Sequence, residues 1–298
     1  MRVLVTGASG FVGRQAVRAL IARGAEVIGL ARRPGPEDCR WIAADLLDAG
    51  QAQASVRDAR PEVVLHLAWT VEHGKFWTDP ANLDWTAATL HLARAAADAG
   101  ARRLVGVGTC YEYAWPSRGP CREASTPLTG HTLYDIAKGS TRQVLEPWCA
   151  GQGLGFCWAR LFFMYGEGET AARFVASVTG SLARGEPALC SSGRPVRDFL
   201  DVEDAGAALA ALALSDVQGA VNVGSGEGVR LADVARMLGE LSGRPDLVRL
   251  GALPDRPGEP PRIVADTTRL ADEAGFRPRI KLREGLERAI RQRALARP

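Results

Sequence analysis

The residues with the clearest chemical potential are a tyrosine and a lysine four positions apart, Tyr134 and Lys138. On a helix, side chains at this spacing lie on the same face. A phenol ordinarily titrates near pH ~10, and a neighbouring ammonium group, together with the positive charge of an oxidised nicotinamide, favours the phenolate and so lowers the pKa of the phenol. Such a pair can exchange a proton with a carbonyl or alcohol oxygen while hydride moves to or from the adjacent carbon. We therefore predict that Tyr134 transfers a proton and that Lys138 lowers its pKa.

Three glycines at three-residue spacing, Gly7, Gly10 and Gly13, follow directly on an apolar segment at the start of the chain. Between a strand and a helix, the first permits a tight turn and the second lets the backbone approach a pyrophosphate. The third lets the helix pack closely on the sheet. The N–H groups and the dipole of the helix N-terminus favour the same anion. The pattern predicts a dinucleotide site that includes Phe11 and Val12, because an ordinary glycine-rich turn does not need this spacing.

The end of the second apolar segment bears on the form of the nicotinamide cofactor. NAD sites have a carboxylate there, which accepts hydrogen bonds from the ribose hydroxyls. In this chain Ala31 stands near that position and is followed by Arg32 and Arg33. A guanidinium group can bind a 2′-phosphate through two hydrogen bonds, so the sequence favours NADP(H). The alternative, that both arginines are only exposed surface charges, leaves NAD(H) possible.

These residues must be positioned by the alternating strands and helices of the first half of the chain. Apolar segments predict strands at 1–6, 26–31, 62–67, 103–109 and 154–162, and amphipathic segments predict helices at about 11–23, 81–99 and 133–148. Apolar strands that are each followed by a helix indicate a parallel sheet covered on both faces. The carboxyl ends of such strands line one crevice, where a ligand binds.

The pattern of the sequence changes after about Gly166. Shorter helices are predicted at about 171–183, 202–214, 230–241 and 282–293, between segments rich in proline and glycine. We predict an α/β fold with a Rossmann-like, doubly wound parallel sheet and a smaller, mixed α/β C-terminal region. The NAD(P)-binding domain is expected over 1–168, with 198–223 returning to it, and the substrate-binding region over 169–298.

Composition narrows the class of protein. Of the 298 residues 46% are hydrophobic, which is enough for a sizeable core. The 37 basic and 34 acidic residues give a net charge of only +3, so no nucleic-acid or membrane partner is expected. No apolar run approaches the roughly 18 residues of a membrane span, and no secretory signal is evident, so we expect a cytoplasmic protein. The six cysteines form no CxxC pair, and no metal site is expected.

Together these features resemble the extended branch of the short-chain dehydrogenase/reductase family, the NAD-dependent epimerase/dehydratase proteins. The resemblance covers nearly the whole chain. It rests on the glycine spacing and on motifs at His66-Leu67-Ala68, Thr109 to Tyr113, Tyr134-x-x-x-Lys138, Arg160 to Gly166, Arg197 to Val202, Asn222 to Gly226, and Arg256-Pro257-Gly258-Glu259. The resemblance implies that Thr109 hydrogen-bonds the reacting oxygen beside Tyr134. It also implies that Asp45 holds the adenine amine, and it adds cofactor contacts at Leu46, Leu67, Ala68, Tyr134 and Lys138.

On the substrate side, the resemblance implies that Arg197 and Arg256 clamp the diphosphate of a nucleotide sugar. Two departures from the family pattern narrow the reaction. Sugar 4,6-dehydratases carry Asp-Glu directly after the catalytic threonine, whereas this chain has Cys110 and Tyr111, which cannot eliminate water. Phe163 stands where the family usually has an asparagine that touches the substrate. The predicted substrate contacts are Trp69, Thr109, Cys110, Tyr134, Phe163, Arg197 and Arg256.

The leading hypothesis is an NADP(H)-dependent reductase of a nucleotide-linked 4-keto (deoxy)hexose, with Tyr134 as proton donor. One alternative is an NAD-dependent nucleotide-sugar 4-epimerase, which uses the same three residues. A second alternative is a catalytically inactive NADP(H)-binding sensor, against which the retention of Thr109, Tyr134 and Lys138 argues. The resemblance also implies a homodimer that pairs the helices at 81–99 and 133–148.

Overall fold

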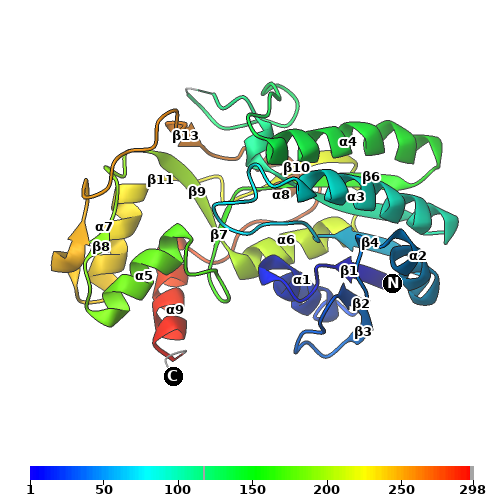
Figure 1. Ribbon diagram of the computed structural model, residues 1–298, viewed down its shortest axis with the longest axis horizontal. Coiled ribbons are helices and arrows are strands. Elements are labelled where there is room, and N and C mark those ends of the chain that lie inside the picture. Colours follow the sequence, from blue (N-terminus) through cyan, green and yellow to red (C-terminus); the bar gives the residue numbers. More distant parts are fainter. Residues whose placement is uncertain (117, 296–298) are drawn as a thin grey trace.

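The computed structural model describes residues 1–116 and 118–295, and its largest element is a seven-stranded sheet (Figure 1). Every neighbouring pair of strands in this sheet is parallel. The strands run in the order β10 (Gly219–Val223), β6 (Gly155–Leu161), β5 (Arg103–Thr109), β4 (Val63–His66), β1 (Arg2–Thr6), β2 (Glu26–Ala31) and β3 (Arg40–Ala43). The predicted Rossmann-like parallel sheet is confirmed.

Helices cover both faces of this sheet, as its apolar strands require. Side chains of α1 (Phe11–Ile21) and α6 (Val202–Leu214) share one buried cluster with the strands. On the other face, α2 (Ala49–Ala59), α3 (Ala81–Asp98) and α4 (Leu133–Gly151) share a second cluster. All residues of β4 and β5 are buried, so the middle of the sheet has no face in water.

The sequence patterns did not reveal β3 and α2. Strand β3 has four residues at the edge of the sheet, and none of them is buried, so it lacks the apolar run of the inner strands. The buried residues of α2 are mostly small, which weakens its apolar pattern. A local signal for α2 was nevertheless present, because the carboxylate of Asp48 caps the helix by accepting from the backbone N–H groups of Gly50 and Gln51.

The rest of the chain forms a smaller region, at the left in Figure 1. Its sheet joins β7 (Phe163–Tyr165), β9 (Val196–Asp201), β11 (Gly228–Arg230) and β13 (Arg262–Ile263), and β8 (Ala188–Leu189) pairs with β12 (Val248–Arg249). Helices α5 (Phe174–Arg184), α7 (Leu231–Leu241) and α9 (Leu282–Leu295) lie beside these strands. A short helix, α8 (Thr268–Asp272), and two 3₁₀ turns, Cys110–Glu112 and Pro245–Leu247, complete the described elements. Residues 198–223 were expected to return to the NAD(P)-binding domain, and they belong to both regions. Helix α6 packs on the large sheet and β10 joins it, whereas β9 is central to the small sheet.

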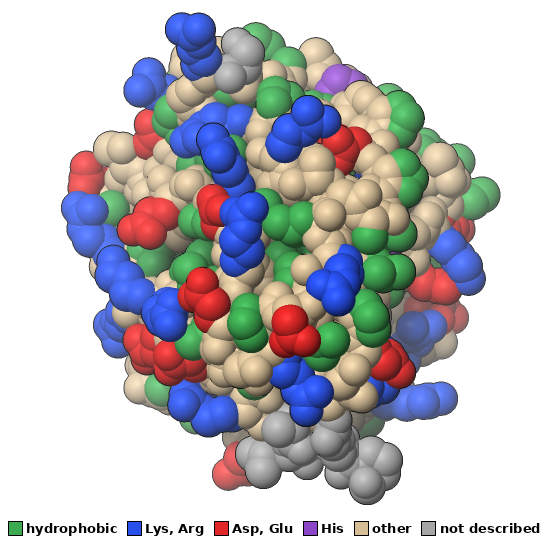
Figure 2. All heavy atoms as spheres, turned by 90° about the vertical axis from the view of Figure 1, so that its left-hand side faces the viewer, with side chains coloured by type: hydrophobic (Ala, Val, Ile, Leu, Met, Phe, Trp, Pro, Cys, Tyr) green, Lys and Arg blue, Asp and Glu red, His purple; other side chains and the backbone are tan. Residues whose placement is uncertain are grey.

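The surface of the smaller region carries both signs of charge. Figure 2 shows basic and acidic side chains interspersed over this face, in keeping with the net charge of +3. Over residues 1–116 and 118–295, no helix is both long and apolar enough to cross a membrane. The same residues contain no group of three or more His, Cys, Asp or Glu side chains that could hold a metal ion.

The close contact between α1 and α6 on one face of the sheet depends on Gly206. A Cβ atom added at Gly206 would lie 2.4 Å from the carbonyl carbon of Gln15 and 2.7 Å from the backbone nitrogen of Ala16. These are backbone atoms of α1, so they cannot rotate away as a side-chain end could. The missing side chain therefore sets how closely the two helices approach.

We predict that Gly206→Ala lowers the free energy of unfolding by about 1–3 kcal/mol, because the added methyl group overpacks this contact. The measurement is urea unfolding followed by circular dichroism. Gly151→Ala is the matched control, since a Cβ there meets nothing within 4 Å. The control should be neutral or more stable by up to about 1 kcal/mol through helix propensity. Equal stability of Gly206→Ala and the parent protein would contradict the close contact.

Candidate functional site

Three of the predicted site residues lie together at the carboxyl edge of the large sheet. Thr109 ends β5, and Tyr134 and Lys138 lie in the first two turns of α4. The helix begins where it does because Thr132 caps it. The Thr132 hydroxyl accepts a hydrogen bond from the backbone N–H of Asp135, and the Asp135 carboxylate accepts one from the backbone N–H of Thr132 at 3.0 Å.

Tyr134 and Lys138 are both buried, at 8% and 4% exposure. The ammonium group of Lys138 donates to the carbonyl oxygen of Val107 at 2.8 Å and lies 3.8 Å from the ring centroid of Trp69. Trp69 and Tyr134 in turn belong to one small apolar cluster. The lysine is therefore fixed in place by β5 and by a neighbouring aromatic ring.

Burial decides the protonation of this group. Burial raises the pKa of Tyr134, and the neighbouring Thr109 hydroxyl opposes the rise only in part. Burial also lowers the pKa of Lys138 to about 7, against a smaller opposite effect from Glu112. In the protein without cofactor, desolvation of the phenolate dominates the pKa of Tyr134. The lowering expected from the charge of Lys138 together with that of an oxidised nicotinamide stays a prediction. At neutral pH the phenol carries its proton.

The sequence analysis missed Glu112, which holds the end of β5 in place. Its carboxylate accepts from the backbone N–H of Thr109 at 2.9 Å, from the indole of Trp158 at 2.9 Å and from the guanidinium of Arg160 at 2.7 Å. Glu112 and Arg160 are each only 1% exposed. A local signal existed, because Thr109 and Glu112 have the spacing of a capping box. The pairing with Arg160, 48 positions away, has no local signal.

The glycine turn has the geometry that a pyrophosphate needs. Gly7 has a φ of +65°, and a Cβ there would lie 2.8 Å from the backbone nitrogen of Ala68. A Cβ on Gly13 would lie 2.1 Å from the carbonyl oxygen of Gly7. Helix α1 starts after Gly10 with no side-chain cap and no acidic residue in its first turn. No side chain of the described residues caps the first N–H groups of this helix, so they can donate to an anion, and Phe11 and Val12 lie in this first turn.

A buried polar chain fixes the loop beneath this turn. The ring nitrogens of His66 lie 2.6 Å from the Thr6 hydroxyl and 2.9 Å from the Thr89 hydroxyl, which joins β1, β4 and α3. Burial, with a smaller effect of Lys138, lowers the pKa of His66 to about 3, so the ring is neutral. The chain continues from His66 through Leu67 and Ala68 to Trp69, whose ring lies against Lys138.

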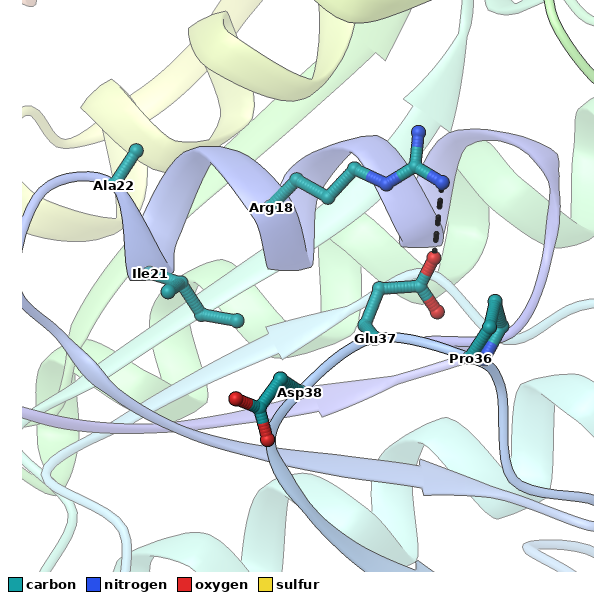
Figure 3. A pocket seen from close by; sticks show the side chains of 6 residues that line it. All are labelled: Arg18, Ile21, Ala22, Pro36, Glu37 and Asp38. Carbon is teal, nitrogen blue, oxygen red and sulfur yellow. Dashed lines mark ion pairs between the residues drawn. The ribbon is translucent and has the colours of Figure 1, made fainter.

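The segment after β2 carries charges of both signs. Arg32 and Arg33 are exposed, and neither forms an ion pair with any residue that the structure describes. Glu37, which no sequence motif singled out, is buried against α1, where it pairs with Arg14 at 3.0 Å. Its second ion pair, with Arg18 at 3.4 Å, is drawn in Figure 3. Its negative charge is thus compensated.

The predicted adenine-side residues lie beyond β3. Asp45 is half-buried, and one of its carboxylate oxygens accepts from the backbone N–H of Leu47 at 3.0 Å. Leu46 is buried, at 4% exposure. The open helix N-terminus, the positive φ of Gly7 and these residues fit a dinucleotide.

Aromatic side chains form a continuous wall from Tyr134 into the smaller region. We call Phe76, Trp77, Tyr111 and Phe163 the aromatic wall. The ring of Phe76 lies 4.8 Å from that of Tyr134, Trp77 lies 4.7 Å from Tyr111, and Tyr111 lies 6.1 Å from Phe163. This surface is apolar and meets Tyr134 at its edge.

The remaining predicted substrate residues differ in accessibility. Arg197 lies 5.5 Å from the Phe163 ring centroid and is only 3% exposed, with its guanidinium paired to Glu259 at 2.9 Å. Arg256 is exposed in the same loop as Glu259. Cys110 is 1% exposed and lies in the core, so contact between its side chain and a substrate would require the core to open. The substrate role of each residue stays a prediction.

The family model of the NAD dependent epimerase/dehydratase family matches residues 3–224. The chain belongs to this family. The match covers the glycine turn, Thr109, Tyr134 and Lys138, together with β9, α6 and β10. The resemblance inferred from the motifs is thereby confirmed.

Several known proteins are similar to this chain. A 3-diazoavenalumate denitrifying reductase from Streptomyces sp is 35% identical over 232 residues, or 75% of each chain. A dTDP-6-deoxy-L-talose 4-dehydrogenase (NAD(P)(+)) from Kitasatospora kifunensis is 31% identical and covers 96% of this chain and 93% of its own. The crystal structure of the Thermus thermophilus UDP-glucose 4-epimerase with NAD has a TM-score of 0.89 at 26% identity, covering 99% of this chain and 100% of that one.

We predict that Lys138 makes stability depend on pH. Its pKa is about 7 in the folded protein against an ordinary value of 10.5, so between these values the unfolded chain binds more protons. The contribution of Lys138 to stability therefore rises with pH over this window, by up to about 1.4 kcal/mol per unit. The free energy of unfolding of the parent protein minus that of Lys138→Met should follow this slope. Lys75→Met, at an exposed lysine, should show no such slope, and a flat difference for Lys138→Met would contradict the lowered pKa.

Proposed function

We propose that the protein is an NAD(P)H-dependent reductase of a nucleotide-linked 4-keto (deoxy)hexose. The observation that carries this proposal is the meeting of Thr109, Tyr134 and Lys138 beside an open glycine turn. Ala68 touches Gly7, and the next residue, Trp69, touches Lys138, so the dinucleotide-type turn and the proton-transfer residues share one edge of the sheet. The similarity to sugar-nucleotide dehydrogenases and epimerases supports the substrate class.

A nicotinamide cofactor held at Gly7, Gly10 and Gly13 would supply the hydride for reduction of the substrate carbonyl carbon. Tyr134, which is protonated at neutral pH, donates its proton to the carbonyl oxygen, and positive charge at the site offsets the rise in its pKa that burial causes. Thr109 donates a hydrogen bond to the same oxygen and orients it. Glu112, which binds the backbone N–H of Thr109, is a positioning residue for that hydroxyl. Lys138, where charged, stabilises the phenolate that remains after proton transfer.

NADP(H) is the proposed cofactor, with NAD(H) as the alternative. Arg32 and Arg33 are exposed at the end of β2, where a 2′-phosphate could reach them. Of the two acidic side chains in the following loop, Glu37 is held by Arg14 and Arg18, so its repulsion of a phosphate is reduced, whereas Asp38 is exposed. NAD(H) remains the alternative because structural neighbours of this chain contain NAD.

A second candidate is a reductase of an aromatic substrate. The aromatic wall beside Tyr134 favours it, because flat apolar rings bind planar aromatic groups well. The 35% identity to a 3-diazoavenalumate denitrifying reductase also favours it. The 4-epimerase alternative uses the same residues and differs in showing no net consumption of NADPH.

The homodimer also stays part of the proposal. Helices α3 and α4 carry exposed apolar side chains, with Leu83 at 62%, Ile136 at 52% and Val144 at 52% exposure. Pairing of these two helices with those of a second copy would remove this apolar surface from water.

We predict that Tyr134→Phe lowers kcat with a 4-keto sugar nucleotide by about 10²–10⁴-fold, the range for loss of a general acid. The dissociation constant for NADPH, measured by fluorescence, should change little. Tyr165→Phe is the control, since this buried tyrosine lies in the smaller region and its hydroxyl makes only a 3.5 Å contact. Undiminished turnover by Tyr134→Phe would reject the assigned proton donor. Conversion of a sugar nucleotide without NADPH consumption would favour the epimerase, and turnover of aryl substrates alone would favour the second candidate.

We predict that Arg32→Ala weakens NADPH binding by about tenfold or more and leaves NADH binding nearly unchanged, because a charge-assisted phosphate contact is lost. Isothermal titration of each cofactor to the parent protein and the variant measures the effect. Arg40→Ala serves as the control, since Arg40 pairs with Asp58 on the surface. An equal effect on both cofactors, or none on NADPH, would remove the basis for the NADP(H) preference.

A further inference from the structure

The guanidinium of Arg197 is already occupied within the protein. It donates to the carboxylate of Glu259 at 2.9 Å and to the carbonyl oxygens of Val196 and Pro260, each at 2.9 Å. Arg197 is 3% exposed, and the Glu259 side chain is 22% exposed above it. The positive charge that could bind an anionic ligand is therefore both neutralised and covered by the loop that carries Glu259.

This loop is anchored at both ends and exposed between them. Before it, Asp255 accepts from the backbone N–H of Ser192 at 3.0 Å and pairs with Arg194. After it, β13 pairs with β9. Residues 256–258 between the anchors are exposed, and Gly258 has a φ of +70°. The side chain of Glu259 thus lies between these anchors, partly exposed to solvent.

Arg197 also adjoins the aromatic wall. Its guanidinium lies over Phe163, which contacts Tyr111. A ligand that lies along the wall from Tyr134 would thus bring its far end to the ion pair of Arg197 and Glu259. An anionic group at that end would lie next to the guanidinium of Arg197 and also next to the carboxylate of Glu259.

We propose that Glu259 is a specificity-determining residue that competes with the substrate's anionic group for Arg197. This proposal rests on the proposed nucleotide-linked substrate. A diphosphate offers more negative charge and more acceptor oxygens than one carboxylate, so it can replace Glu259 on the guanidinium. A neutral nucleoside cannot replace it. Glu259 thereby lowers the affinity for every anion and leaves only strongly charged ligands able to bind at this position.

The test compares Glu259→Gln with the parent protein, both saturated with NADP⁺, by isothermal titration with dTDP, UDP, inorganic pyrophosphate and thymidine. Removal of the competing carboxylate should lower the dissociation constants of the two nucleoside diphosphates and of pyrophosphate by about tenfold or more, since close buried charge pairs couple strongly. Thymidine binding should not change. Glu259→Asp, which keeps the charge, should stay near the parent. Glu186→Gln, at an exposed ion pair with Arg184, controls for net charge.

The outcomes separate this proposal from the proposed function. Unchanged affinity of Glu259→Gln for pyrophosphate and diphosphates would overturn the competition. An equal gain in affinity for thymidine would overturn it as well. The cause would then be a change in the loop and not the release of the Arg197 guanidinium from Glu259. A third outcome is that Glu259→Gln binds pyrophosphate more tightly but that neither protein binds dTDP or UDP. This outcome would support the competition at Arg197 and reject the nucleotide-linked substrate.

Discussion

The candidate site depends on one buried ion pair, between Glu112 and Arg160. Both side chains are almost fully removed from water, so each charge needs the other, and loss of one partner in such a pair typically costs about 3–5 kcal/mol. The same carboxylate binds the backbone N–H of Thr109 and the indole of Trp158. It therefore fixes the end of β5 against β6. The position of the Thr109 hydroxyl, and of α4 that packs beside it, follows from this pair.

Burial then determines the protonation of Tyr134 and Lys138 beside the end of β5. The pKa of Tyr134 rises and that of Lys138 falls to about 7, because both groups lose contact with water. At neutral pH the phenol is therefore protonated, which is the state that the proposed reduction requires of a proton donor. Desolvation alone makes the phenol a weaker acid, so proton transfer in the proposed reaction depends on positive charge at the site to stabilise the phenolate.

Three of the ion pairs in which a glutamate holds a buried or half-buried arginine bear on the candidate site. Glu112 pairs with Arg160 between β5 and β6. Glu37 pairs with Arg14 beside the end of β2. Glu259 pairs with Arg197 at the end of the aromatic wall. The pair of Glu112 and Arg160 is buried in the core and stabilises the fold. The other two lie next to positions where anions are proposed to bind. In a chain with 37 basic and 34 acidic residues, charge compensation of this kind controls which arginines remain available to a ligand.

The sequence by itself determined the parallel sheet, the glycine turn and the pairing of Tyr134 with Lys138 on one helix, because these follow from short, regular spacings. It did not reveal β3, whose four residues at the sheet edge lack an apolar run. Only the tertiary structure decided the protonation of Tyr134 and the occupation of Arg197 by Glu259, 62 positions away. Desolvation and ion pairing depend on which distant segments come together, and no local pattern of residues records that.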